Sequence, residues 1–185
     1  DENIDALTFG KVRGCTNHGA VDADLNVGGI AGAMAIEYEL DPEGDQKESS
    51  SVFDRVYETK AVVQHCVNRG SISGKKDCIG GIVGEMATSS KTTVEQNWYN
   101  TGAVTGTNPS VKARIGALAG KGYGSSGSVV YPVYKNCYYA KTSETVFALG
   151  GEATDREGLI AKTAEELKTA DLGAGFVADS ENVNG

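Results

Sequence analysis

Residues 66–84 have the sequence CVNRGSISGKKDCIGGIVG, and the chain repeats this pattern of a cysteine, an Asn-x-Gly and a glycine-rich block. Upstream, CTNHGAVDADLNVGGIAG at residues 15–32 has the same order. Downstream, WYNTGAVTGTNPSVKARIGALAG at residues 98–120 begins with tryptophan instead of cysteine. A fourth, eroded copy, CYYAKTSETVFALGG at residues 137–151, keeps the cysteine and a Gly-Gly pair but loses the Asn-x-Gly. Self-similarity of this kind indicates a stack of similar units.

Within each copy, the residue types predict short strands that are separated by sharp corners. Branched residues in the glycine-rich block suit a short buried strand, and the glycines beside them suit tight bends and close backbone approach. Asn-x-Gly predicts a corner, because both residues tolerate the left-handed conformation. The positions expected to have such structural roles are Cys15, Asn17, Gly19, Gly28, Gly29, Cys66, Asn68, Gly70, Gly80, Gly81, Trp98, Asn100, Gly102, Gly116 and Cys137.

The spacing of the copies favours stacked repeats. They begin at residues 15, 66, 98 and 137, and unequal steps fit a rigid unit with loops of variable length. Units this short cannot bury a hydrophobic face alone, so they should stack. We therefore predict an all-β fold, a parallel β-solenoid (β-helix) of about three to four irregular repeats with a short C-terminal capping helix. A β-sandwich also has short strands and frequent turns, but it does not require nearly identical residues at matching positions.

Two segments without the pattern interrupt the solenoid, which we expect to span residues 1–158. Residues 37–57 are polar and acidic, with Asp-Pro and Glu-Gly turn signals, and predict a long loop or a small hairpin. Residues 121–135 are rich in Gly and Ser and predict an irregular loop. The final segment, residues 159–185, contains the capping-box sequence TAEELK. A short helix there could cover the open end of the solenoid, where an exposed strand edge is unfavourable.

The composition argues against several classes of partner. The chain of 185 residues has 17 Lys and Arg against 25 Asp and Glu, a net charge of -8. An acidic surface repels phosphate groups, so we expect neither a nucleic-acid partner nor binding to anionic membranes. No apolar run reaches the roughly 18 residues that a membrane-spanning helix needs. The acidic first residues do not resemble a signal peptide, and the chain stops abruptly at ENVNG, so we interpret it as a mature segment of a larger parent chain.

The repeated pattern resembles the GLUG-type repeat, which consists of C-x-N-x-G, a short spacer and V-G-G-I-[AV]-G. The matching residues are Cys15, Asn17, Gly19 and residues 27–32 in the first copy, and Cys66, Asn68, Gly70 and residues 79–84 in the second. The third copy departs from the pattern at Trp98 and Ala117. The resemblance covers most of residues 12–185 outside the segment 37–57. It implies large secreted or surface-anchored bacterial proteins, including adhesins and immunoglobulin A protease-like proteins, in which such repeats are non-catalytic and extracellular.

Three alternatives are open for the four cysteines, Cys15, Cys66, Cys78 and Cys137. Equivalent positions in a solenoid repeat at roughly 4.8 Å, so an intervening Trp98 coil would hold Cys66 and Cys137 beyond the limit of about 7 Å for a disulfide. Cys15 and Cys66 could pair if their coils are adjacent, whereas free cysteines could pack as small apolar residues. A zinc site would need His18 or His65, but no C-x2-C or H-x3-H pair is present. We favour free, buried cysteines.

Other catalytic and metal-binding patterns are weak. The sequence DADLNVG at residues 22–28 places its acidic residues like a calcium loop, but the glycine is displaced and Ala33 stands where the loop needs glutamate. We therefore expect no cofactor, with adventitious calcium at this acidic turn left open. No G-x-S-x-G is present, and His18 and His65 both lie inside the repeats, so we assign no catalytic residue and expect no enzyme. Paired carboxylates that cleave polysaccharides cannot be recognised from spacing alone.

Aromatic residues supply the candidate ligand contacts. Exposed tyrosines on loops can stack on sugars or contact a protein, although they can also pack a loop onto the solenoid wall. The candidates are Tyr38, Phe53, Tyr57, Tyr123, Tyr131 and Tyr134. We predict a non-catalytic stalk or adhesion scaffold at the bacterial cell surface, with a host or matrix glycan or protein as its partner. The alternatives are a carbohydrate-binding module, or an accessory region of a larger secreted protease or glycan-cleaving enzyme.

Overall fold

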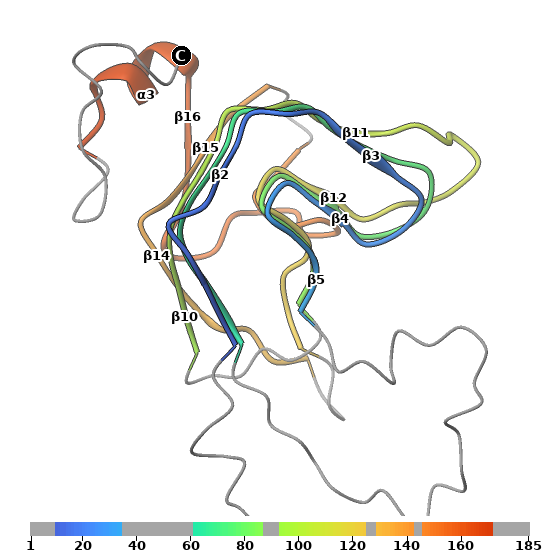
Figure 1. Cartoon of the computed structure of the whole chain (residues 1–185), viewed down its shortest axis with the longest axis horizontal. Coiled ribbons are helices and arrows are strands. Elements are labelled where there is room, and N and C mark those ends of the chain that lie inside the picture. Colours follow the sequence, from blue (N-terminus) through green and yellow to red (C-terminus); the bar gives the residue numbers. More distant parts are fainter. Residues whose placement is uncertain (1–9, 35–60, 87–92, 125–128, 143–145, 172–185) are drawn as a thin grey trace, which may run out of the picture.

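The chain winds into stacked coils, where a coil is one full turn of short strands (Figure 1). The computed structural model describes residues 10–34, 61–86, 93–124, 129–142 and 146–171. The strands of coil 1 are β1 (Lys11–Arg13), β2 (Thr16–Asn17), β3 (Val21–Ala23), β4 (Val27–Gly28) and β5 (Ala31–Ala33). Those of coil 2 are β6 (Val62–Asn68), β7 (Ile72–Gly74), β8 (Ile79–Gly80) and β9 (Val83–Glu85). Those of coil 3 are β10 (Val94–Asn100), β11 (Val104–Gly106), β12 (Ile115–Gly116) and β13 (Ala119–Lys121).

The structure becomes less regular after coil 3. Coil 4 contains β14 (Val133–Lys135) and β15 (Cys137–Ala140), and β16 (Leu159–Lys162) follows. The predicted helix is present as α3 (Ala164–Thr169), and its N-terminus has the predicted capping box of Thr163 and Glu166. Figure 1 shows α3 beside the end of β16, at the outer corner of the coils.

Equivalent strands of successive coils pair to form four sheets. The largest has the order β1-β6-β10-β15-β16, with β2 and β14 also paired to it. Three smaller sheets have the orders β11-β7-β3, β12-β8-β4 and β13-β9-β5. All of these pairings are parallel. A β-sandwich has antiparallel sheets, so the structure confirms the predicted parallel β-helix architecture.

The register of the strands places equivalent repeat residues on top of each other. Trp98 lies opposite Cys66, and Asn100 lies opposite Asn68. The pairing of Tyr99 with Tyr138 puts Cys137 next to Trp98 in the same row. The copies therefore stack in one register although they are spaced unequally along the chain. The extra residues of the longer copies lie between the strands.

A row of left-handed residues, which the sequence did not reveal, precedes the cysteine position in every turn. Its members all have positive φ and are Gly14, His65, Asn97, Asn136 and Gly158. Such a residue interrupts the strict alternation of a strand, and in coil 2 it lets Val63 and Cys66, three residues apart, both lie in the core. Glycine, asparagine and histidine are the residue types that tolerate this conformation best.

The Asn-x-Gly corners differ from the prediction in their backbone conformation. Positive φ angles occur at neither the asparagines nor the glycines of these corners. The glycines are needed for close approach instead: a Cβ on Gly70 would lie 1.9 Å from the carbonyl oxygen of Gly19, and one on Gly102 would lie 1.9 Å from that of Gly70. The corner of each coil therefore rests directly on the glycine carbonyl of the coil before it.

The glycine-rich blocks have the close backbone approach that was predicted for them. A Cβ on Gly28 would lie 2.1 Å from the carbonyl oxygen of Ala31, and one on Gly80 would lie 2.0 Å from that of Val83. In the fourth copy, however, the pairing of Ala119 with Leu149 places Gly150 opposite the last glycine of the block. The Gly-Gly pair of this copy is therefore not equivalent to the Gly-Gly pairs of the first two copies.

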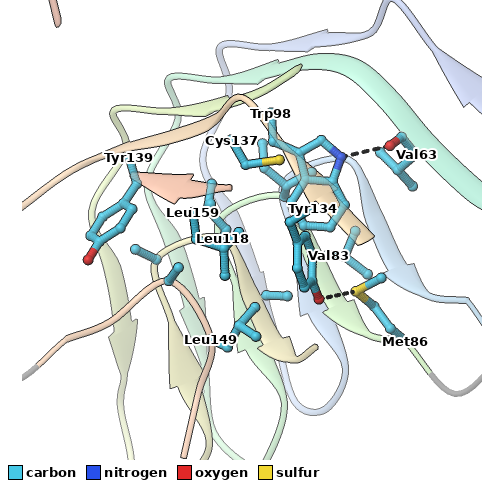
Figure 2. Packing of buried hydrophobic residues seen from close by; sticks show 14 of the residues in the cluster. Val63, Val83, Met86, Trp98, Leu118, Tyr134, Cys137, Tyr139, Leu149 and Leu159 are labelled. Atoms are coloured by element: carbon cyan, nitrogen blue, oxygen red, sulfur yellow. Dashed lines mark hydrogen bonds between the residues drawn. The ribbon is translucent and has the colours of Figure 1, made fainter. Parts of the chain in front are cut away.

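The interior of the stack is apolar and continuous. Its centre is Trp98, whose indole Nε1 donates a hydrogen bond to the carbonyl oxygen of Val63 at 2.7 Å (Figure 2). Tyr134 packs edge-on against Trp98, with ring centroids 5.8 Å apart. Beyond coil 3, Leu149 and Leu159 belong to the same buried cluster. Two expected segment boundaries move as a result: residues 133–135 of the predicted irregular loop form β14, and residues 159–162 of the predicted end segment form β16.

Candidate binding surface

A ladder of asparagine side chains runs along one corner of the first three coils. The Nδ2 of Asn17 donates to the Oδ1 of Asn68 at 2.8 Å, and the Nδ2 of Asn68 donates to the Oδ1 of Asn100 at 2.8 Å. Each Nδ2 also donates to the carbonyl oxygen of the corner glycine two residues later. Asn68 and Asn100 are buried, so these bonds satisfy amide groups that have no access to water. The ladder fixes the relative position of the coils.

Cys15, Cys66 and Cys137 lie in one row, as the repeat predicted. Cys66 and Cys137 are buried on either side of Trp98, and Cys15 lies partly exposed in the coil next to Cys66. All four cysteines are free. Burial raises the pKa of the Cys137 thiol to about 12 and that of the Cys78 thiol to about 12, and burial also raises the pKa of Cys66. These thiols are protonated at neutral pH and pack as apolar groups.

Two of the candidate ligand-contact tyrosines form a surface pair. The rings of Tyr123 and Tyr131 lie 5.4 Å apart at an interplanar angle of 57°. The guanidinium carbon of Arg156 lies 3.2 Å from the centroid of the Tyr131 ring, and Nζ of Lys121 lies 5.5 Å from that of Tyr123. Both tyrosines are half-buried, so part of each ring is accessible. We call Tyr123, Tyr131, Arg114, Glu152 and Arg156 the tyrosine–arginine cluster.

Charged groups fix the orientation of this cluster. Arg114 donates from Nε to Asp77 at 2.9 Å and from Nη1 to the hydroxyl of Tyr123 at 3.4 Å. Its hydrogen bond with Asp77 raises the pKa of Arg114, which is therefore charged throughout the neutral range. The hydroxyl of Tyr131 donates to a carboxylate oxygen of Glu152. Each ring thus has its hydroxyl bound and one side covered by a cation.

Arg114, Glu152 and Arg156 belong to no motif, and sequence reasoning missed them. Arg114 precedes β12 at the position that Cys78 occupies in coil 2 and Asn26 in coil 1, as the pairing of β4, β8 and β12 shows. This position directly precedes the glycine-rich block, so aligning the copies would have located it, and coil 3 departs from the other two there. Glu152 and Arg156 follow the eroded fourth copy, where no repeat pattern remains to guide an alignment.

Tyr134 is not a surface contact, and the expectation that it could touch a ligand is wrong. It is buried against Trp98, and its hydroxyl donates to the carbonyl oxygen of Gly122 at 2.6 Å. Figure 2 shows its ring within the core, with the hydroxyl directed toward Met86. Tyr134 lies on β14 and fills the interior of the stack, so it neither contacts a ligand nor packs a loop onto the solenoid wall. Tyr38, Phe53, Tyr57 and the whole segment 37–57 lie outside the described residues.

Two lysines of coil 2 contact the acidic turn of coil 1. Nζ of Lys75 lies 3.1 Å from a carboxylate oxygen of Asp24, and Nζ of Lys76 lies 3.8 Å from the other. The hydrogen bond from Lys75 lowers the pKa of Asp24. The candidate zinc ligands Cys66 and His65 point to different surroundings. Cys66 is buried in the core, whereas Nδ1 of His65 lies 2.9 Å from Nδ2 of Asn97. Across the described part of the chain, no group of three or more His, Cys, Asp or Glu side chains could hold a metal ion.

One buried carboxyl group lies in the core of coil 3. Glu95 is fully buried, and its Oε2 accepts a hydrogen bond from the backbone N–H of Val63 at 2.7 Å. Its Oε1 has no hydrogen-bond partner among the described residues. Burial raises the pKa of Glu95 to about 8, so the carboxyl group is mostly protonated at neutral pH. Sequence reasoning did not single out Glu95, because glutamate is usually exposed.

Comparison of the chain with protein-family models, with curated proteins and with solved structures finds no match. The fold therefore rests on the strand pairings described above, and the resemblance to GLUG-type repeats stays a prediction from the sequence. Among the helices that the structure describes, none is long and apolar enough to cross a membrane.

Proposed function

We propose that this chain is a non-catalytic repeat module that serves as a stiff stalk or adhesion scaffold in a secreted or surface-anchored bacterial protein. The observation that carries the proposal is the continuity of the stack. The asparagine ladder joins three coils, and one apolar cluster extends from Met34 in coil 1 to Leu159 after coil 4. Coils that contact only their neighbours can extend a structure in one direction without enlarging its cross-section. The sequence resemblance supports the extracellular location.

Pulling experiments on single molecules test the scaffold function. The chain is held at engineered attachment points near residues 10 and 171, and the force needed to open it is recorded. We expect high, stepwise forces, because each coil is joined to the next by parallel strands and by the ladder. Asn68→Ala should lower the force, whereas Lys168→Ala, which removes only an exposed ion pair on α3, should leave it unchanged. Opening at the low force of an unstructured chain would contradict the proposal.

A carbohydrate-binding role is the second candidate, and the tyrosine–arginine cluster is the observation that favours it. Half-exposed aromatic rings held in place by charged groups can stack on sugar rings, and the charged groups can bond to hydroxyls. The cluster would supply the partner-binding surface of the scaffold, with a host or matrix glycan or protein as the ligand.

A glycan array that also carries matrix proteins tests this second role. We expect binding by the unmodified chain and loss of binding by Tyr131→Ala. Tyr99→Ala is the matched control, because Tyr99 is also half-buried but lies on β10, outside the cluster. Binding that survives Tyr131→Ala, or binding lost equally with Tyr99→Ala, would remove the cluster from consideration.

A further inference from the structure

The two ends of the stack differ in a way that bears on what they can contact. The last strand, β16, pairs with β15 and continues into α3. Coil 1, at the other end, pairs only with coil 2 among the described strands. Its core residues are correspondingly less buried: Val21 is half-buried, whereas the equivalent Ile72 in coil 2 is completely buried. Within the described part of the chain, coil 1 therefore presents an edge of parallel strands on which no further strand pairs.

The asparagine ladder has a direction, and its acceptor end lies at this edge. Each Nδ2 donates toward the following coil, so Asn68 and Asn100 accept through Oδ1 from the coil before them. The Oδ1 of Asn17 has, among the described residues, only the backbone N–H of Gly19, at 3.1 Å. Asn100 shows that the same oxygen can accept a corner N–H and a ladder amide together. Asn17 thus has room for one more donor, from the open side.

The corner glycine of coil 1 supplies an independent observation. In coils 2 and 3 the corner must be glycine, because the carbonyl oxygen of the preceding corner lies 1.9 Å from where a Cβ would be. At Gly19, a Cβ would meet only the Oδ1 of Asn17, at 3.7 Å, among the described residues. Gly19 also has no positive φ that would call for glycine. Space for a glycine carbonyl is therefore present at this edge without an occupant in the described structure.

The backbone of β3 faces the same side. The N–H of Val21 donates to the carbonyl oxygen of Ser71 in coil 2 at 2.9 Å. In a parallel sheet, successive residues direct their backbone groups to opposite neighbours, so the N–H and carbonyl of Asp22 face the open side. Unpaired backbone groups along a strand are a template for a further strand.

From these observations we propose that the outer edge of coil 1 is a docking surface for one more coil of the same kind. The added coil runs parallel to coil 1 and carries an Asn-x-Gly whose asparagine donates to Asn17 and whose glycine carbonyl rests on Gly19. The position of each group follows from continuing the interface that joins coils 1, 2 and 3. Such a docking surface does not depend on the function that the stack serves.

The far end of a second copy does not fit this surface. At that end, the position of Asn100 is taken by Tyr139 in coil 4, and next to it by Ala161 on β16. Neither side chain can donate a carboxamide N–H to Asn17. The occupant that matches is therefore a coil with the Asn-x-Gly corner, not the C-terminal face of another molecule.

An extended chain tests the proposal. A second copy of residues 61–92, which comprises coil 2 and its natural connection to the next coil, is inserted between residues 9 and 10 of the full chain. We expect hydrogen exchange at the Asp22 amide to slow on the order of tenfold or more, and the unfolding temperature to rise. The matched control carries alanine in place of the asparagine in the Asn-x-Gly of the inserted copy. Its unfolding temperature should rise less, and exchange at Asp22 should slow less. Unchanged exchange at Asp22 in a folded extended chain would overturn the proposal.

Gly19→Ala supplies a second test that does not depend on the extended chain folding well. In the chain of natural length the substitution should leave the unfolding temperature unchanged, because no described residue occupies the space at Gly19. In the extended chain Gly19→Ala should cancel the rise in unfolding temperature, since the added methyl group would clash with the glycine carbonyl of the inserted coil. Strong destabilisation of the natural-length chain by Gly19→Ala would show that the site is already filled and would refute the proposal.

Discussion

Coil 1 and coil 2 have nearly the same sequence pattern, yet equivalent residues in the two coils differ in how many neighbouring coils they contact. Asn68 and Gly70 are enclosed between two coils, whereas Asn17 and Gly19 have a coil on one side only among the described strands. Ile82 is fully buried, and its equivalent Ile30 is half-buried. The difference indicates that the contribution of a repeat residue to stability depends on the coils on both sides of it. Matched substitutions in the two coils therefore separate the effect of the residue type from the effect of stacking.

The largest contrast is expected for the isoleucines. Ile82→Ala should lower the free energy of unfolding by about 2–5 kcal/mol, because it opens a cavity in a closed core. Ile30→Ala should cost about 1–2 kcal/mol, since water already reaches part of this side chain. Chemical denaturation of both variants measures the two values, and equal losses would show that coil 1 is as enclosed as coil 2.

The ladder asparagines should differ next. Asn68→Ala removes a buried amide that donates to Gly70 and Asn100 and accepts from Asn17, and we expect a loss of about 2–3 kcal/mol. Asn17→Ala, at the edge, should cost about 1 kcal/mol, because Asn17 is only half-buried and water can reach groups that the substitution leaves unpaired. Chemical denaturation again provides the measurement, and a larger loss at Asn17 than at Asn68 would contradict this account of the ladder.

A buried carboxyl group extends the comparison to coil 3. One inward row contains Val12, Val63 and Glu95 in coils 1, 2 and 3, and Tyr134 in coil 4. The pKa of Glu95 is raised to about 8, so between about pH 4.5 and pH 8 the folded protein holds a proton that the unfolded chain releases. Stability should therefore be greatest at low pH within this window and fall as pH rises, by up to about 1.4 kcal/mol per pH unit.

Denaturation curves across this pH window test the origin of the slope. Glu95→Gln should flatten it, because glutamine has no proton to lose. Adding Val12→Glu to that variant should not restore it, since Val12 is 37% exposed and a carboxylate there stays hydrated. A slope that persists in Glu95→Gln would assign the pH dependence to other groups.

The last prediction concerns the reactivity of the thiols and involves no change in stability. Cys15 is partly exposed, whereas Cys66, Cys78 and Cys137 are buried. An alkylating reagent should modify Cys15 first in the folded protein, and Cys15→Ser should abolish this early reaction. Mass spectrometry of digested samples identifies the modified residue, and early labelling of Cys66 would show that the edge opens readily.

Particular residues show how far the sequence could lead. The repeat of cysteine, Asn-x-Gly and glycine-rich block was enough to predict parallel coils, because residues at matching positions in successive copies imply matching positions in space. The corner was located correctly, but its glycine was given a left-handed backbone when the structure uses it to admit a carbonyl oxygen. His65 and Asn97 have the left-handed conformation instead, and no shared residue type marked that row.

The candidate surface could be predicted only in part. Tyr123 and Tyr131 lie in a segment whose aromatic residues were noticeable in the sequence, and Tyr134 of the same segment is buried. Burial was not predictable there, because β14 pairs with β10, and the paired residues Val94 and Val133 are far apart in the sequence. Asp77 contacts Arg114 from the neighbouring coil, and such a pair becomes adjacent only when the coils stack.

The sequence by itself determined the repeat, the class of fold and the positions of the corners, because these depend on local conformational preference and on identical residues recurring along the chain. Only the tertiary structure decided which glycines touch a carbonyl, which tyrosine is buried, that Glu95 is buried and holds its proton, and which edge lacks a neighbour among the described strands. Those properties depend on the distance between atoms of different coils, and that distance is set by the stacking of the whole solenoid, which no single repeat encodes.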